Sequence, residues 1–107
     1  IASNTQANTL LMFNIKEFSK INLLFGHKIG DNIIQEVIGR MINIDGILHA
    51  YRIYGDEFAI MFPSTLNGTI TASFKQAVEQ QDYRAKSSMI TLSFYGSLAK
   101  ITPHVLE

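Results

Sequence analysis

The sequence predicts a single α+β domain in which an antiparallel sheet carries helices packed on it. Short β-prone segments and helical patterns alternate along the chain, and two of the β-prone segments flank a glycine turn at Gly55. The chain has 107 residues, of which 47% are hydrophobic and 17% are charged, as is typical of one soluble globular domain. No repeat or low-complexity linker interrupts residues 1–107, so we treat them as one domain.

Composition narrows the classes of function. The formal net charge is zero and there is no run of Lys or Arg, so the usual electrostatic signature of nucleic-acid or anionic-membrane binding is missing. No apolar run approaches the roughly 18 residues of a membrane span, and no signal peptide is recognisable. The chain has no cysteine, which excludes disulfides and thiolate chemistry and is compatible with a cytoplasmic protein.

The first half of the chain predicts one strand followed by two helices. Thr9–Ile15 is an almost entirely apolar run, which predicts a strand buried on both faces. Lys16–Leu24 shows helical spacing, and a stronger helix is expected over Asp31–Asn43, with Asp31 as its N-cap. A turn at Asp45-Gly46 ends this helix. Its apolar stripe comprises Ile34, Val37, Ile38, Met41 and Ile42.

The second half predicts a hairpin, a helix and a final strand. Leu48–Ile53 and Phe58–Phe62 are the expected hairpin strands, and an amphipathic helix follows until about Gln81. Asp82–Ser88 is expected to be a polar loop, and the alternation over Ile90–Tyr95 predicts one last strand. Taken together, the order is β-α-α-β-β-α-β, the split βαβ pattern of ferredoxin-like domains with helices on one face of the sheet.

This topology places the end of the first strand beside the hairpin. Adjacent carboxylates on a rigid turn could hold a divalent cation, and a glycine leaves room for a ligand beside the backbone. Together with backbone N–H groups at a helix start, they form the groups that metal-assisted nucleotidyl transfer needs. A solvated acidic turn without a ligand is the alternative. The residues brought together are Asn14, Ile15, Lys16, Gly55, Asp56 and Glu57.

Four spaced segments of the chain carry recognisable motifs. The first is residues 13–18, and the second combines Ile21-Asn22, Phe25-Gly26-His27 and Gly30-Asp31. The third is residues 52–58, and the fourth is Thr91-Leu92-Ser93 with Gly96. In this order they resemble the motifs D-I-D-x-F, I-N-D-x-[YF]-G-H-x-x-G-D, R-Y-G-G-D-E-F and T-x-S-x-G of the GGDEF domain family of bacterial diguanylate cyclases.

The resemblance implies a palm-like fold that condenses two GTP molecules into cyclic di-GMP across a homodimer with Mg²⁺. It implies that Asn22 and Asp31 bind the guanine base and that the backbone of Gly55 approaches the nucleotide. Asp56 would be the metal-binding and catalytic acid, with Glu57 as its catalytic neighbour. The metal would also bind the backbone carbonyl of Ile15 and, weakly, the side chain of Asn14.

Several positions depart from the family pattern. Asn14 replaces the first metal-binding aspartate, and an amide binds Mg²⁺ more weakly than a carboxylate. Lys16 replaces the second aspartate and adds positive charge, and Leu23 replaces the aspartate of I-N-D. Tyr54 replaces the first glycine of the signature and is expected to crowd the nucleotide. The R-x-x-D product site is absent at Asp45 and Leu48.

The chain is also expected to be a fragment. The family's leading segment and final helix have no counterpart, and Leu106-Glu107 is typical of the residue pair left before a purification tag. The leading hypothesis is a GTP-binding or dimerising regulatory module of cyclic di-GMP signalling with lost or weak cyclase activity, beside a phosphodiesterase or sensor domain. One alternative is an active Mg²⁺-dependent diguanylate cyclase. The other is a protein–protein interaction domain with an empty pocket.

Overall fold

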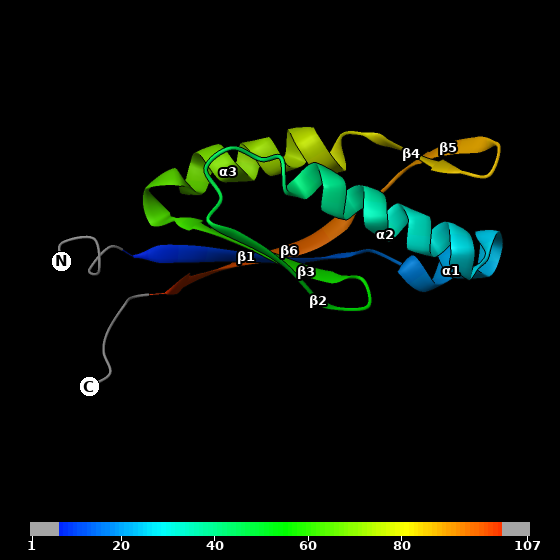
Figure 1. Cartoon of the computed structure of the whole chain (residues 1–107), viewed down its shortest axis with the longest axis horizontal. Coiled ribbons are helices and arrows are strands. Elements are labelled where there is room, and N and C mark those ends of the chain that lie inside the picture. The colour runs from blue at the N-terminus through cyan, green and yellow to red at the C-terminus, as the bar shows by residue number, and fades with distance from the viewer. Residues whose placement is uncertain (1–6, 102–107) are drawn as a thin grey trace.

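A four-stranded antiparallel sheet forms the centre of the computed structural model, which describes residues 7–101. Its strands lie in the order β2-β3-β1-β6, and helices α2 and α3 lie along one face of the sheet (Figure 1). The sheet strands are β1 (Asn8–Ile15), β2 (His49–Tyr54), β3 (Glu57–Pro63) and β6 (Phe94–Ile101). This order is the ferredoxin-like one, so the predicted α+β class is confirmed.

Three main helices, two short connecting helices and a small hairpin complete the fold within residues 7–101. The short connecting helices are η2 (Ser64–Leu66), before α3, and the π-helical turn η3 (Lys75–Glu79), which continues it. None of the helices within residues 7–101 is both long and apolar enough to cross a lipid bilayer. The main helices are α1 (Phe18–Phe25), α2 (His27–Met41) and α3 (Asn67–Phe74), and the hairpin pairs β4 (Asp82–Ala85) with β5 (Ser88–Thr91).

Strand β1 has one buried face and one open face. Leu11, Phe13 and Ile15 are buried under the helices, whereas Met12, on the opposite face, is 40% exposed. The expectation that this strand is buried on both faces is therefore wrong. The cause is the one-sided helix layer, which covers only alternate side chains of a strand.

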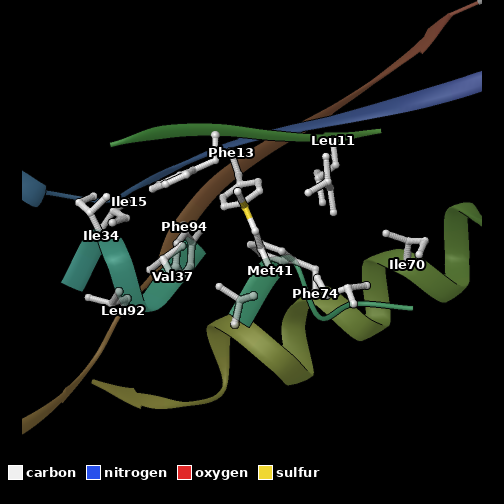
Figure 2. Packing of buried hydrophobic residues seen from close by; sticks show 14 of the residues in the cluster. Leu11, Phe13, Ile15, Ile34, Val37, Met41, Ile70, Phe74, Leu92 and Phe94 are labelled. Atoms are coloured by element: carbon white, nitrogen blue, oxygen red, sulfur yellow. The ribbon is translucent and has the colours of Figure 1, made fainter. Parts of the chain in front are cut away.

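An aromatic cluster forms the middle of the core. The Phe13 ring lies 4.4 Å from that of Phe74, 5.3 Å from that of Phe58 and 5.8 Å from that of Phe94, measured between ring centroids. Figure 2 shows Phe13, Phe74 and Phe94 enclosed between the sheet and the helices, with Met41 beside them. Residues from the sheet and from two helices thus share one core.

Helix α2 begins earlier than predicted. It starts at His27, directly after Gly26, whose φ of 91° allows an abrupt connection from α1. Asp31 therefore lies inside the helix with an exposed side chain, and its prediction as the N-cap is wrong. The predicted stripe is largely confirmed because Ile34, Val37 and Met41 are buried and Ile38 is partly buried. Ile42, just past the helix, is 55% exposed.

The segment expected to be a polar loop is instead the β4–β5 hairpin. It turns at Lys86, which has a left-handed φ of 58°, and it buries Tyr83 and Ala85. The expected last strand is also divided, because β5 ends at Thr91 and β6 begins at Phe94. At this break the Ser93 carbonyl accepts the Lys16 N–H at 2.8 Å, which ties the start of β6 to the end of β1.

Tyr83 attaches this hairpin to the helices. Its hydroxyl donates to the Val78 carbonyl at 2.6 Å, and the Arg40 guanidinium carbon lies 4.2 Å from the centre of its ring. Arg40 also donates to the carboxylate of Glu36 at 2.6 Å and to the carbonyl of Asp82 at 3.1 Å. Burial raises the pKa of the Tyr83 hydroxyl above its ordinary value, against the opposing effect of Arg40.

Candidate functional site

The β2–β3 hairpin places Gly55 and Asp56 at its tip. Gly55 has a left-handed φ of 55°, and among the described residues no atom outside its two chain neighbours would lie within 4 Å of a Cβ at this position. The strand pairing shifts by a bulge between Arg52 and Tyr54, and the Arg52 Nε donates to the Gly55 carbonyl at 2.9 Å. The turn is thus fixed by a backbone irregularity and a side chain, and it leaves open space beside Gly55.

The structure brings the hairpin tip and the end of β1 together, as the topology predicts. Asn14 is the register partner of Glu57 across the β1–β3 ladder. The Ile15 N–H donates a long hydrogen bond of 3.4 Å to the Asp56 carbonyl. Asn14 and Asp56 are partly buried, whereas Glu57 is exposed. These four residues form a strand-end group, defined as Asn14, Ile15, Asp56 and Glu57.

A shallow groove of about 320 Å³ lies on the open face of the sheet beside this group. Asn14 and Glu57 line it together with Tyr95 of β6, which is the other register partner of Asn14. The Lys16 ammonium nitrogen lies 4.8 Å from the centroid of the Tyr95 ring, a cation–π contact. This contact holds the Lys16 charge close to the strand-end group.

The donor atoms of the strand-end group are of the type that Mg²⁺ prefers. The Asp56 carboxylate, the Asn14 amide oxygen and the Ile15 carbonyl are all hard oxygen donors. However, these three donors carry only one formal negative charge. Within residues 7–101, no three His, Cys, Asp or Glu side chains gather in an arrangement that could hold a metal ion. The residues therefore fit Mg²⁺ by donor type but offer it little charge.

The two predicted base-binding residues lie on adjacent helices. Asn22 is partly buried on α1, and its side chain packs against Gly30 of α2, the residue immediately before Asp31. Asp31 is exposed. The structure thus brings the Asn22 amide to the neighbourhood of Asp31, although no hydrogen bond joins them in the described part of the chain. Lys16 and Glu17 connect this helix pair to the strand-end group.

Three residues that shape the candidate site were not identified from the sequence. Arg52 fixes the turn and Tyr95 faces Lys16, and both contacts depend on strand register that a sequence motif does not reveal. Gly30 allows the close approach of Asn22. A glycine inside a helical pattern is a signal of close packing, and this signal was available in the sequence.

The strand order and the strand-end group define a ferredoxin-like α+β domain with a candidate nucleotide site. The family model described as "Diguanylate cyclase, GGDEF domain" matches residues 1–100. The chain therefore belongs to the GGDEF domain family.

Curated relatives agree with this assignment. The chain is 33% identical over 112 residues to diguanylate cyclase VdcA of Vibrio cholerae, an alignment that covers 95% of this chain and 32% of VdcA. It is 37% identical over 57 residues to diguanylate cyclase DgcN of Escherichia coli, covering 52% of this chain and 14% of DgcN. The chain thus spans about a third or less of the length of these relatives.

Solved structures agree on the fold. An EAL/GGDEF domain protein from M. capsulatus superposes with a TM-score of 0.77 and 26% identity, covering 89% of this chain and 64% of that one. The GGDEF domain of PA1120 from Pseudomonas aeruginosa gives a TM-score of 0.79 at 23% identity, covering 95% and 65% of the two chains.

Proposed function

We propose that this chain is a GTP-binding regulatory module of cyclic di-GMP signalling whose cyclase activity is lost or weak. The observation that carries the proposal is the contrast between two parts of one site. The base-binding pair Asn22 and Asp31 is retained on adjoining helices. The strand-end group has an amide at Asn14, where the family has a carboxylate, and Lys16 beside it.

Each part has a separate chemical task. A carboxylate at Asp31 can accept hydrogen bonds from guanine N–H groups, and the Asn22 amide can complete recognition of the base edge. A bound Mg²⁺ would neutralise triphosphate charge and lower the pKa of an attacking hydroxyl. Asp56 and the Ile15 carbonyl would hold it, with Glu57 as the neighbouring acid. A site with this little negative charge supports binding of nucleotide better than turnover.

Calorimetric titration with GTP, in the presence and absence of Mg²⁺, tests the proposal. We expect GTP to bind with a preference over ATP that Asp31→Ala removes. Because Asp31 is exposed on α2, this substitution should leave the fold unchanged, and circular dichroism checks that it does. Equal binding of GTP by the wild-type chain and by Asp31→Ala would refute base recognition at this residue.

Weak but real cyclase activity is the second candidate, favoured by the presence of Asp56 at the hairpin tip beside β1. Condensation of two GTP molecules requires two half-sites, so it also requires a homodimer. We expect chromatography to detect little or no cyclic di-GMP from the wild-type chain, and sedimentation with GTP to report whether it dimerises. If Asp56→Ala forms as much cyclic di-GMP as the wild-type chain, the product does not come from this site.

A pure interaction domain with an empty pocket receives less support. The Tyr54 side chain, which is expected to crowd the nucleotide, is 79% exposed, so its ring can rotate away from the turn. We place the module in the cytoplasm, where GTP is available, and beside a phosphodiesterase or sensor domain. The similarity to the EAL/GGDEF domain protein from M. capsulatus supports a second domain beside this one.

A further inference from the structure

The contact between α1 and α2 depends on the absence of a side chain at Gly30. This glycine is buried inside α2. A Cβ built on it would overlap the Oδ1 atom of Asn22 and would lie 3.0 Å from its Cγ. The next nearest atom is the Cζ of Phe18, at 3.2 Å. The Asn22 amide therefore occupies the space that a side chain at residue 30 would need.

A second glycine in the same helix provides a comparison. Gly39 is exposed, and apart from its chain neighbours and the nearby backbone of α2, no atom of the described residues lies within 4 Å of the position that its Cβ would take. Glycine lowers the stability of a helix interior relative to alanine at either position. At residue 30 the Asn22 side chain fills the space that a Cβ would need, which explains the glycine there. At residue 39 no such packing requires glycine.

The backbone of Asn22 is held independently of its amide. Its carbonyl accepts the Gly26 N–H at 2.8 Å, where α1 ends and α2 begins. Asp31 is fixed by the helical backbone of α2, one residue after Gly30. A methyl group at residue 30 would therefore displace the Asn22 amide by side-chain rotation, because the far end of a side chain moves more readily than a hydrogen-bonded backbone.

We propose that Gly30 is a positioning residue for guanine recognition. It lets the Asn22 amide lie against α2, so that the amide and the Asp31 carboxylate reach the same base. Gly30 itself contributes no polar group to the base. This inference rests on the proposed GTP binding and adds to it the residue that sets the relative placement of the two recognition groups.

A set of four variants tests the proposal by calorimetry with GTP and with inosine triphosphate, whose base lacks the 2-amino group. We expect Gly30→Ala to weaken GTP binding roughly tenfold, the loss of about one hydrogen bond, and to reduce the preference over inosine triphosphate. Gly39→Ala is the matched control and should bind both nucleotides like the wild-type chain. Asn22→Ala and the double variant Asn22→Ala/Gly30→Ala should bind equally, because the displaced amide is already absent.

The outcomes separate this inference from the proposed function. If the wild-type chain shows no preference for the guanine base, the proposed function fails before any variant is compared. If the wild-type chain prefers GTP over inosine triphosphate and Gly30→Ala shows the same preference, the positioning role is refuted. It is also refuted if Gly30→Ala weakens GTP binding as much in the Asn22→Ala background as in the wild type, because the loss of affinity would then not depend on the Asn22 amide. The Asn22 side-chain NH₂ signals in the nucleotide-free protein should shift in Gly30→Ala and stay unchanged in Gly39→Ala.

Discussion

Arg52 and Gly55 are joined by a single side-chain hydrogen bond of 2.9 Å at the hairpin that carries Asp56. Arg52 is exposed, so we expect Arg52→Ala to lower the free energy of unfolding by no more than about 1 kcal/mol. The local effect should be larger, because the turn loses the bond that closes it. Hydrogen exchange of the Ile15 amide, which donates to Asp56, should become faster.

Arg84 offers a control for this prediction. It is an exposed arginine on β4, outside the sheet that carries the site. Arg84→Ala should leave exchange of the Ile15 amide unchanged. Equal exchange rates in both variants would mean that Arg52 does not hold the turn.

In the proposed metal site, the residue at position 14 changes how much negative charge the strand-end group carries. We expect Asn14→Asp to tighten Mg²⁺-dependent GTP binding and to create or increase formation of cyclic di-GMP, because a carboxylate binds Mg²⁺ better than an amide does. Asn8→Asp adds the same charge on the same face of β1, at its other end, and should change neither quantity. Unchanged Mg²⁺ dependence in Asn14→Asp would argue against a metal at this position.

Residue roles of this kind were only partly predictable. The strand-end group follows from topology, since a split βαβ order places the first strand next to the hairpin. Gly30 and Arg52 act through interatomic contacts that periodicity does not encode. Asp31 was misassigned as an N-cap because an acidic residue before an apolar stripe also occurs inside helices, and the true start depends on the backbone of Gly26.

At the scale of elements, the hydrogen bond from the Tyr83 hydroxyl to the Val78 carbonyl links β4 to the end of the α3–η3 helix. We expect Tyr83→Phe to lower the free energy of unfolding by about 1 to 3 kcal/mol, because it leaves the Val78 carbonyl without its buried partner. Urea denaturation measures the change. Tyr95→Phe alters an exposed ring of the same type and should have little effect.

Tyr83 also predicts how stability depends on alkaline pH. Its pKa is raised by burial, so the folded state favours the protonated hydroxyl. Stability from this group is present below the unfolded pKa of about 10 and is lost as the pH rises through the folded value. We expect the urea midpoint of the wild-type chain to fall above pH 10 more steeply than that of Tyr83→Phe. Parallel pH profiles would contradict this assignment.

The helices and strands differ in how well they can be predicted from the sequence. Strands β1, β2 and β3 were predicted because an apolar run and a glycine turn between alternating segments are strong local signals. The β4–β5 hairpin was missed because its four-residue strands are too short to show periodicity, and its turn uses Lys86 in place of glycine. Its structure depends on tertiary contacts of Tyr83 and Arg40.

At the scale of the whole molecule, Phe13 contacts the rings of Phe58 and Phe94 on the neighbouring strands and that of Phe74 on helix α3, so it joins the sheet to the helix layer. We expect Phe13→Ala to lower the free energy of unfolding by roughly 3 to 5 kcal/mol, through lost burial and the cavity left behind. Met12→Ala, one residue earlier on the open face, should cause a much smaller change because its side chain is 40% exposed. Thermal and urea denaturation should give the same order of stability for the two variants. Similar losses of unfolding free energy in both would contradict the assignment of Phe13 to the buried face of β1 and of Met12 to the open face.

The global architecture was the most predictable level. Helices confined to one face follow from the order of elements, and the confirmed strand order leaves few other arrangements. Burial of β1 on both faces was the exception. An apolar sequence alone does not tell which face of a strand the helices will cover, and Met12 is therefore open although its neighbours are buried.

The two faces of β1 have a consequence for how this domain can evolve. Phe13 and Ile15 belong to the core, while Asn14 between them faces the groove, so an exchange at Asn14 leaves the buried side chains untouched. Codons for asparagine and aspartate differ by one base. A lineage can therefore gain or lose a carboxylate at the proposed metal site by a single point mutation, while the folding of the domain stays under separate selection at the alternate positions.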